Sequence, residues 1–179
     1  AAARAGLLAK ADLVSETVGE FPELQGIIGG YLATDDEGGA IAAAIAGHYQ
    51  PEGPAEAAPS DALTMAVALA DKIDTLVGFF GVGAIPTGSK DPYALRRSAL
   101  GVIRIIVENN LDLELTSLLG HAAKAYGFDA AADGLMPFMH DRFKVWMRDQ
   151  GIRHDVVTAT LREHDRGDDR SNDRGNDRG

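Results

Sequence analysis

The residues with the clearest chemical potential are the basic side chains between positions 90 and 104. In a helix, the spacing from Arg97 through Gly101 to Arg104 places two guanidinium groups on one face with a gap between them. Such a face suits contact with a phosphate backbone, because guanidinium groups bind phosphate and glycine permits close approach. In a chain with a net charge of −10, this interval holds four basic residues and one acid: Lys90, Asp91, Arg96, Arg97 and Arg104.

The same spacing also has a structural interpretation. Gly101 would let another helix pack closely between the two arginines. Arg104 would pair with Glu108 one turn later, which stabilises a helix by roughly a few tenths of a kcal/mol. Spacing alone favours packing, and both interpretations remain open on the sequence.

Two other patterns carry a weaker signal. Residues 83–90 (GAIPTGSK) are similar to a phosphate loop, but Gly-Ser-Lys replaces Gly-Lys-Ser, no strand precedes it and Pro86 lies inside it. His-Asp pairs begin at His140, His154 and His164, and none has a partner ligand at helical metal-binding spacing. No Ser–His–Asp or Cys–His arrangement emerges, so local motifs predict no catalytic centre.

The basic residues lie on the second of two strongly patterned helices. For the first helix, Ser60 after Pro59 is the expected N-cap, and glycines 78, 81 and 83 are expected to end it. For the second, Asp91 is the expected N-cap with Pro92 at the first helical position. The expected apolar stripe of the first helix is Ala66, Leu69, Ala70, Ile73, Leu76, Val77 and Phe80. The expected buried positions of the second are Leu95, Ala99, Val102, Ile103, Ile106 and Val107.

The remainder of the chain also shows helical periodicity and no sustained alternation of apolar and polar residues, which predicts an all-α fold. Residues 34–39 are expected to form a turn or helix start, and residues 50–59 a proline-rich surface loop. The other expected helices are 1–18, 21–33, 40–49, 114–126, 138–150 and 155–162.

Composition limits the function. Apolar residues make up 45% of the chain, no run is long enough to span a membrane, and cysteine is absent, which excludes disulfides and thiolate metal sites. Residues 1–89 carry twelve acidic side chains against three basic ones. A pI near 4.8 argues against general nucleic-acid binding, so any contact with RNA must be a local patch.

Three long motifs resemble the β subunit of the bacterial two-subunit glycine–tRNA ligases. They lie at 18–33 (VGEFPELQGIIGGYLA), at 70–107 (which contains ADKIDTLVGFFGVG and PTGSKDPYALRRSALGVIRII) and at 142–157 (RFKVWMRDQGIRHDVV). They occur in the family's order, and the resemblance covers about residues 9–161. The β chain of that family is several times longer, so the resemblance implies a fragment of it.

The resemblance also implies a degenerate HD-domain-like helical bundle. Active HD-type phosphohydrolases use His and Asp side chains to hold a metal that activates water. By this resemblance, Asp12 in Lys10-Ala11-Asp12 and Asp71 are vestiges of such a site, with Ala11 in place of the imidazole. Both carboxylates are expected to be buried and hydrogen-bonded, with no metal bound.

The family resemblance implies that the α subunit activates glycine with ATP and Mg²⁺, whereas the β subunit contacts tRNA(Gly) and the α subunit. We therefore expect no catalytic residue, metal or cofactor in this segment, no membrane contact and a cytoplasmic location. The alternatives are a residual metal-dependent phosphohydrolase and a purely structural scaffold. The expected tRNA-binding residues are Lys90, Arg96, Arg97 and Arg104, with a weaker second patch at Arg142, Lys144, Arg148 and Arg153.

The expected domain organisation has three parts. Residues 1–126 form the HD-like helical domain, and residues 127–162 form a helical segment leading towards the anticodon-binding domain of the family. Residues 163–179 repeat Asp-Arg pairs without an apolar side chain, so this tail is expected to be disordered.

Overall fold

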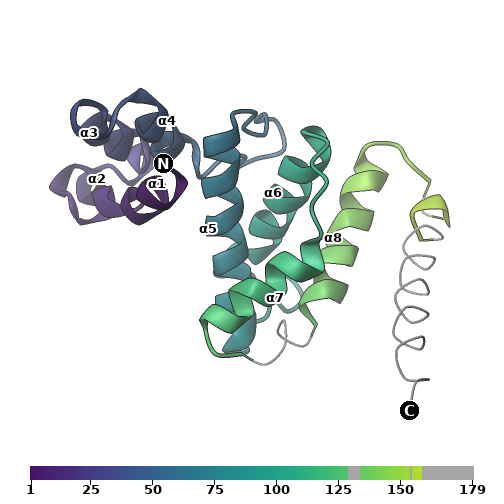
Figure 1. Cartoon of the computed structure of the whole chain (residues 1–179). Coiled ribbons are helices and arrows are strands. Elements are labelled where there is room, and N and C mark those ends of the chain that lie inside the picture. Colours follow the sequence, from purple (N-terminus) through teal and green to yellow (C-terminus); the bar gives the residue numbers. More distant parts are fainter. Residues whose placement is uncertain (129–133, 154, 159–179) are drawn as a thin grey trace, which may run out of the picture. The chain divides into compact units, whose positions relative to one another are not determined.

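The computed structural model describes residues 1–128, 134–153 and 155–158, and divides the chain into two compact units, Ala1–Leu135 and Met136–Gly179 (Figure 1). The described residues are helical with no strand, which confirms the all-α prediction for that part of the chain. The predicted domain limits at 126 and 162 stay predictions. The predicted disordered tail, 163–179, lies outside the described residues.

The first unit is built from seven α-helices and two short 3-10 helices within its described residues. They are connected by short turns, apart from the long links before α5 and α6. In chain order they are α1 (Ala2–Leu8), η1 (Ala11–Val14), α2 (Glu16–Glu20), η2 (Pro22–Leu24), α3 (Ile27–Glu37), α4 (Gly39–Gly47), α5 (Ala62–Gly81), α6 (Leu95–Glu108) and α7 (Leu115–Ala125).

Helix α5 is the centre of this unit and packs against α1, α4, α6 and α7 (Figure 1). Its N-cap is Asp61 and not Ser60 as expected, because the Asp61 carboxylate accepts hydrogen bonds from the backbone N–H groups of Leu63 and Thr64. The predicted apolar stripe is confirmed at its five larger side chains, which are buried: Leu69, Ile73, Leu76, Val77 and Phe80. It is wrong at its two alanines, Ala66 and Ala70, which are exposed.

Helix α6 packs against α5. Four of its predicted core positions are buried, namely Leu95, Ala99, Val102 and Ile103. Val107, also expected in the core, is 42% exposed, whereas Ile105 is fully buried. The buried face of α6 is therefore wider in its middle turn than the apolar stripe predicts.

The predicted single helix over residues 1–18 is wrong. The α-helix ends at Leu8, a short 3-10 helix (η1) follows, and the next α-helix begins only at Glu16. One cause is Ser15, whose hydroxyl donates to the Asp12 carbonyl and accepts from the Val18 N–H, so that it caps α2. A continuous helix would also remove the Asp12 side chain from its buried position.

Helices α3 and α4 approach each other closely because glycine and alanine line their contact. A Cβ at Gly29 would lie 2.9 Å from Cγ2 of Ile45, and one at Gly30 would lie 3.0 Å from the carbonyl oxygen of Ala42. Helix α3 continues to Glu37, where a turn was expected from residue 34. It ends at Gly38, whose φ of 84° is readily adopted only by glycine.

Helix α8 (Leu135–Asp149) begins at the last residue of the first unit and forms most of the described second unit. Within it, the rings of Phe143 and Trp146 lie 6.4 Å apart between centroids. A further helical turn at 155–158 matches the start of the predicted last helix.

None of the helices in the described ranges is both long and apolar enough to cross a lipid bilayer.

Candidate nucleic-acid interface

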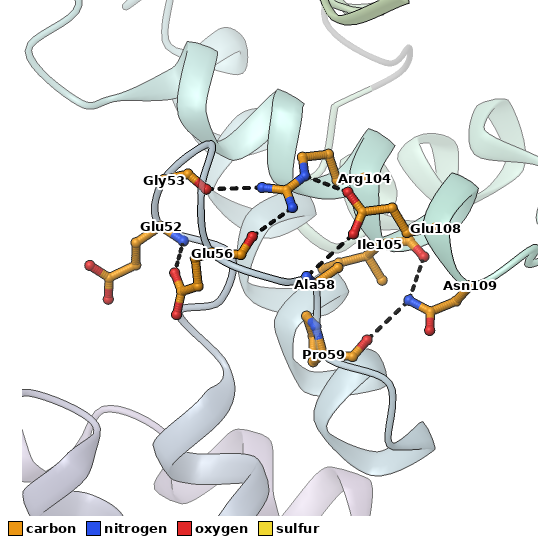
Figure 2. A network of polar contacts seen from close by, with 9 residues as sticks. All are labelled: Glu52, Gly53, Glu56, Ala58, Pro59, Arg104, Ile105, Glu108 and Asn109. Atoms are coloured by element: carbon orange, nitrogen blue, oxygen red, sulfur yellow. Dashed lines mark hydrogen bonds and ion pairs between the residues drawn. The ribbon is translucent and has the colours of Figure 1, made fainter. Parts of the chain in front are cut away.

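Arg104 holds the loop at residues 50–59 and does not face solvent. Its side chain is only 8% exposed. Its Nη1 donates to the Gly53 carbonyl at 2.9 Å, its Nη2 to the Glu56 carbonyl at 2.6 Å, and its Nε to Oε1 of Glu108 at 2.6 Å (Figure 2). The other Glu108 oxygen accepts from the Ala58 N–H at 3.4 Å.

This placement contradicts the expectation that Arg104 contacts tRNA phosphates. The 50–59 loop has carbonyl groups that no regular helix satisfies, and a buried guanidinium with several donors satisfies them together. Asn109 continues the same contact, because its Nδ2 donates to the Pro59 carbonyl at 3.0 Å (Figure 2). Arg104 is therefore removed from the candidate interface.

Lys72 on α5 is a second buried cation, and it binds the two residues that precede this loop. Its Nζ donates to the carbonyls of His48 and Tyr49, both at 3.0 Å, just where α4 ends and its carbonyls lose helical partners. Burial lowers the pKa of Lys72 to about 8. We refer to Lys72 and Arg104, with the 48–59 segment they hold, as the loop clamp.

The gap beside Gly101 is filled from within the protein. A Cβ at Gly101 would lie 2.6 Å from Cε and 2.8 Å from Cδ of Lys72. The glycine on α6 therefore makes room for a lysine stem from α5, and no open channel remains between Arg97 and Arg104. This geometry supports the packing interpretation of Gly101 over the phosphate-approach interpretation.

Of the four predicted contact residues, the three that stay at the surface belong to residues 82–97, which we call the basic turn. Lys90 and Arg97 are exposed, and Arg96 is partly exposed. The turn runs from the end of α5 into the first turn of α6. It therefore retains three of the four predicted contact residues.

Backbone hydrogen bonds fix the shape of the basic turn. Thr87 and Lys90 exchange two of them, at 3.1 and 2.9 Å. Nη2 of Arg96 donates to the Gly88 carbonyl at 2.7 Å, which ties the first turn of α6 to the tip of the basic turn. Lys90 is therefore presented from a hairpin-like bend closed by two hydrogen bonds.

Asp91 is the acidic residue of the basic turn, and its carboxylate binds backbone N–H groups. Its two carboxylate oxygens accept from the N–H groups of Leu95 at 2.8 Å and Arg96 at 3.0 Å. Helix α6 begins at Leu95 and not at Pro92 as predicted, because Ala94 adopts a left-handed conformation with φ 53°. The carboxylate thus lies at the positive end of a helix, where its charge is offset locally.

Tyr93 is a candidate interface residue that the helical pattern does not identify. Its ring stacks on Phe79 of α5 with centroids 4.0 Å apart and planes inclined by 19°. The residue is 49% exposed. An aromatic residue interleaved with Lys90, Arg96 and Arg97 is the sequence signal that points to it.

Asp12 is buried and hydrogen-bonded, as expected. It is 1% exposed, and its Oδ2 accepts from the N–H of Gly26 at 2.6 Å and of Gly29 at 3.0 Å. Its Oδ1 has no hydrogen-bond partner in the part of the chain that the structure describes. The carboxylate therefore joins η1 to the start of α3.

Asp71, which lies on α5, forms an ion pair with Lys10. Its Oδ1 lies 2.9 Å from Nζ of Lys10, and its side chain is 18% exposed. The same ammonium lies 4.5 Å from the centre of the Tyr49 ring. Burial alone would lower the pKa of Lys10, but the hydrogen bond and charge of Asp71 outweigh it and raise that pKa.

His48 lies beside this ion pair and is fully buried. Its Nδ1 donates to the Ile45 carbonyl at 2.6 Å, which leaves Nε2 without a proton and without a partner among the described residues. Burial lowers the pKa of His48, so the imidazole is neutral at pH 7. Within the described ranges, no three His, Asp or Glu side chains are placed to hold a metal ion.

The predicted second patch is paired within its own unit. Lys144 lies 3.8 Å from Asp141, and Arg148 lies 3.8 Å from Asp149. Arg153 forms a closer ion pair, 2.6 Å, with Asp155. The guanidinium of Arg142 lies 5.9 Å from the centre of the Phe138 ring. Nearby carboxylates therefore offset much of the positive charge of this patch.

Comparison with known proteins adds an independent finding. The sequence profile of the family described as "Glycyl-tRNA synthetase beta subunit" matches residues 1–162. The chain is 52% identical over 170 residues to the glycine–tRNA ligase beta subunit of Aromatoleum aromaticum (strain DSM 19018 / LMG 30748 / EbN1), covering 92% of this chain and 24% of the relative. It is also 52% identical over 161 residues to that of Rhodospirillum centenum (strain ATCC 51521 / SW), covering 88% of this chain and 22% of the relative.

The chain thus spans about a quarter of the length of the curated relatives it matches. The family profile matches residues 1–162, which include the whole first unit and the described part of the second. On that match, the chain belongs to the glycyl-tRNA synthetase beta subunit family.

Proposed function

We propose that this chain is the part of a glycine–tRNA ligase β subunit that binds and positions tRNA(Gly), with Lys90, Arg96 and Arg97 contacting phosphates. The observation that carries this proposal is a fixed, exposed cluster of cations in a strongly acidic chain whose relatives are named as tRNA ligase subunits. Phosphate contacts of this kind set position and orientation and do not read sequence.

The proposed holoenzyme divides its work between subunits. Glycine activation with ATP and Mg²⁺ takes place in the α subunit, and this segment supplies neither a catalytic residue nor a cofactor. The segment also contributes to assembly with the α subunit in the cytoplasm. A purely structural scaffold is the competing function, and the exposure of Lys90 and Arg97 favours tRNA contact over it.

The test uses the α–β complex whose β subunit carries this segment. Binding of tRNA(Gly) is measured over a range of salt concentrations for the wild type and the Lys90→Ala/Arg97→Ala variant. We expect weaker binding and a log–log salt slope that is shallower by about two phosphate contacts. The matched control is Lys124→Ala, an exposed lysine at the end of α7, which should leave the slope unchanged. An unchanged slope in the double variant would favour the scaffold.

We further propose that the first unit is a degenerate HD-type bundle. In support, Asp12 on η1 and Asp71 on α5 both influence the electrostatics of Tyr49, so the two carboxylates belong to one neighbourhood. Asp71 is engaged by Lys10, and Ala11 stands where the resemblance places an imidazole, so nothing favours phosphohydrolase activity. Elemental analysis of the purified complex tests this, and stoichiometric metal lost in Asp71→Ala would contradict it.

A further inference from the structure

The ring of Tyr93 has one face against the protein and much of the remainder in solvent. Phe79 covers that first face in a nearly parallel stack, 4.0 Å between centroids. Phe79 is itself half-buried on α5, so the pair is anchored in the core-facing helix. A half-exposed aromatic ring stacked on a second one presents a flat apolar surface for a third ring.

The backbone on both sides of Tyr93 is held in place. Ala94 donates to the Asp91 carbonyl at 3.2 Å, and the Asp91 carboxylate accepts from the Leu95 and Arg96 N–H groups. The bend at Thr87 and Lys90 closes the other side. Because the ring is already ordered, a ligand that stacks on it loses little additional conformational freedom of the protein.

The charged residues that flank Tyr93 in the sequence indicate the kind of ligand. Lys90 and Arg97 are exposed on either side of Tyr93 in the sequence, and the carboxylate of Asp91 is engaged by backbone donors. A flat aromatic surface with an exposed cation three residues before it and another four residues after it matches a nucleotide, which offers a planar base and a phosphate. Bases inside a duplex are already stacked on their neighbours, so the matching nucleotide is an unpaired one.

We propose that Tyr93 is a stacking platform for an unpaired nucleobase of the bound tRNA, with the adjoining phosphates held by Lys90 and Arg97. This inference rests on the proposed tRNA function and extends it, because phosphate contacts alone require no aromatic residue. It assigns the basic turn to a single-stranded part of the tRNA and not to a helical stem.

The test compares three variants of the α–β complex: Tyr93→Ala, Tyr93→Leu and Tyr93→Phe. We expect the alanine and leucine variants to bind tRNA(Gly) between about 5-fold and about 150-fold more weakly, with an unchanged salt slope because no charge is lost. The phenylalanine variant keeps the ring and should bind like the wild type. Leucine keeps apolar contact with Phe79, so it decides the matter if the alanine variant is poorly folded.

Three outcomes separate this inference from the proposed function. Tyr93→Leu binding like the wild type while Lys90→Ala/Arg97→Ala binds weakly overturns the platform and leaves tRNA binding intact. Normal tRNA binding with lost α-subunit association makes Tyr93 a protein contact, which also overturns it. If neither set of variants changes tRNA binding, both proposals fail. Competition by a single-stranded oligoribonucleotide, but not by a duplex of equal length, supports the platform.

Discussion

The loop clamp and the basic turn use the same kinds of side chain for opposite purposes. The side chain of Arg104 is 8% exposed, and its guanidinium donates hydrogen bonds to two carbonyls and a carboxylate. Arg97, two helical turns earlier on α6, is exposed. Lys72 is buried against two carbonyls, whereas Lys90 is exposed on a bend.

The two regions differ in the backbone carbonyls that lie near each cation as hydrogen-bond acceptors. Residues 50–59 contain three prolines and no regular structure, so several of their carbonyls need donors from elsewhere. A buried cation is tolerated only where such acceptors surround it. In the basic turn, the backbone pairs with itself through Thr87 and Lys90, and the side chains of Lys90 and Arg97 stay exposed to a ligand.

The largest effect that tests this contrast is on folding stability. Arg104→Ala should lower the free energy of unfolding by about 3 to 4 kcal/mol, because the Gly53 and Glu56 carbonyls lose their donors and Glu108 loses its partner. Arg97→Ala, the matched change on the exposed face, should cost less than about 0.5 kcal/mol. Urea denaturation of both variants measures the difference.

Equal losses of unfolding free energy in Arg104→Ala and Arg97→Ala would contradict the contrast between the loop clamp and the basic turn. They would mean that the 50–59 loop opens without cost, or that Arg97 carries a structural contact of similar strength. Arg104→Lys refines the test, since a single ammonium cannot donate to three acceptors in the guanidinium geometry. We expect it to recover less than half of the lost stability.

A pH titration distinguishes the lysine of the clamp from the exposed lysines. The pKa of Lys72 is about 8 in the folded chain and near 10.5 when unfolded, so the unfolded chain binds more protons between these values. Stability from this group therefore rises as the pH increases from about 8 to about 10.5, and is lost as the pH falls back. Relative to Lys72→Met, the wild type should gain roughly 2 to 3 kcal/mol over that window.

The control for the titration is Lys124→Met, an exposed lysine on α7. Its stability difference from the wild type should be flat across the same pH range. A flat difference for Lys72→Met as well would mean that water reaches the ammonium in the folded chain. Lys72 would then differ from Lys90 in position only.

Much of the fold could be predicted from periodicity, because α5 and α6 bury most of their predicted apolar stripes and α7 forms within the predicted range 114–126. The N-terminal region could not. Alanine-rich sequence supports a continuous helix, but the Asp12 carboxylate bonds to Gly26 and Gly29 across a turn of the chain. That long-range contact overrides local propensity, and no pattern within residues 1–18 encodes it.

The sequence predicts the candidate site as a set of basic residues. Only the tertiary structure distinguishes the members that are exposed from the one that is buried. Lys90 and Arg97 are exposed as a contact surface requires, but Arg104 is paired with a loop some fifty residues earlier in the chain. Helical spacing describes one helix and carries no information about such a loop. Tyr93 lies outside both helical stripes, so periodicity does not single it out, although its basic neighbours in the sequence do.

The smallest effect concerns the packing beneath the clamp. Gly101→Ala should lower the free energy of unfolding by about 1 to 2 kcal/mol, because its Cβ would displace the Lys72 stem and weaken the bonds of Nζ. Gly120→Ala on α7 meets nothing within 4 Å and should stabilise the chain by about 0.5 to 1 kcal/mol through helix propensity alone. Stabilisation by both substitutions would show that the lysine stem moves aside freely. A loss confined to Gly101→Ala, abolished in a Lys72→Ala background, ties the glycine to the clamp and not to phosphate approach.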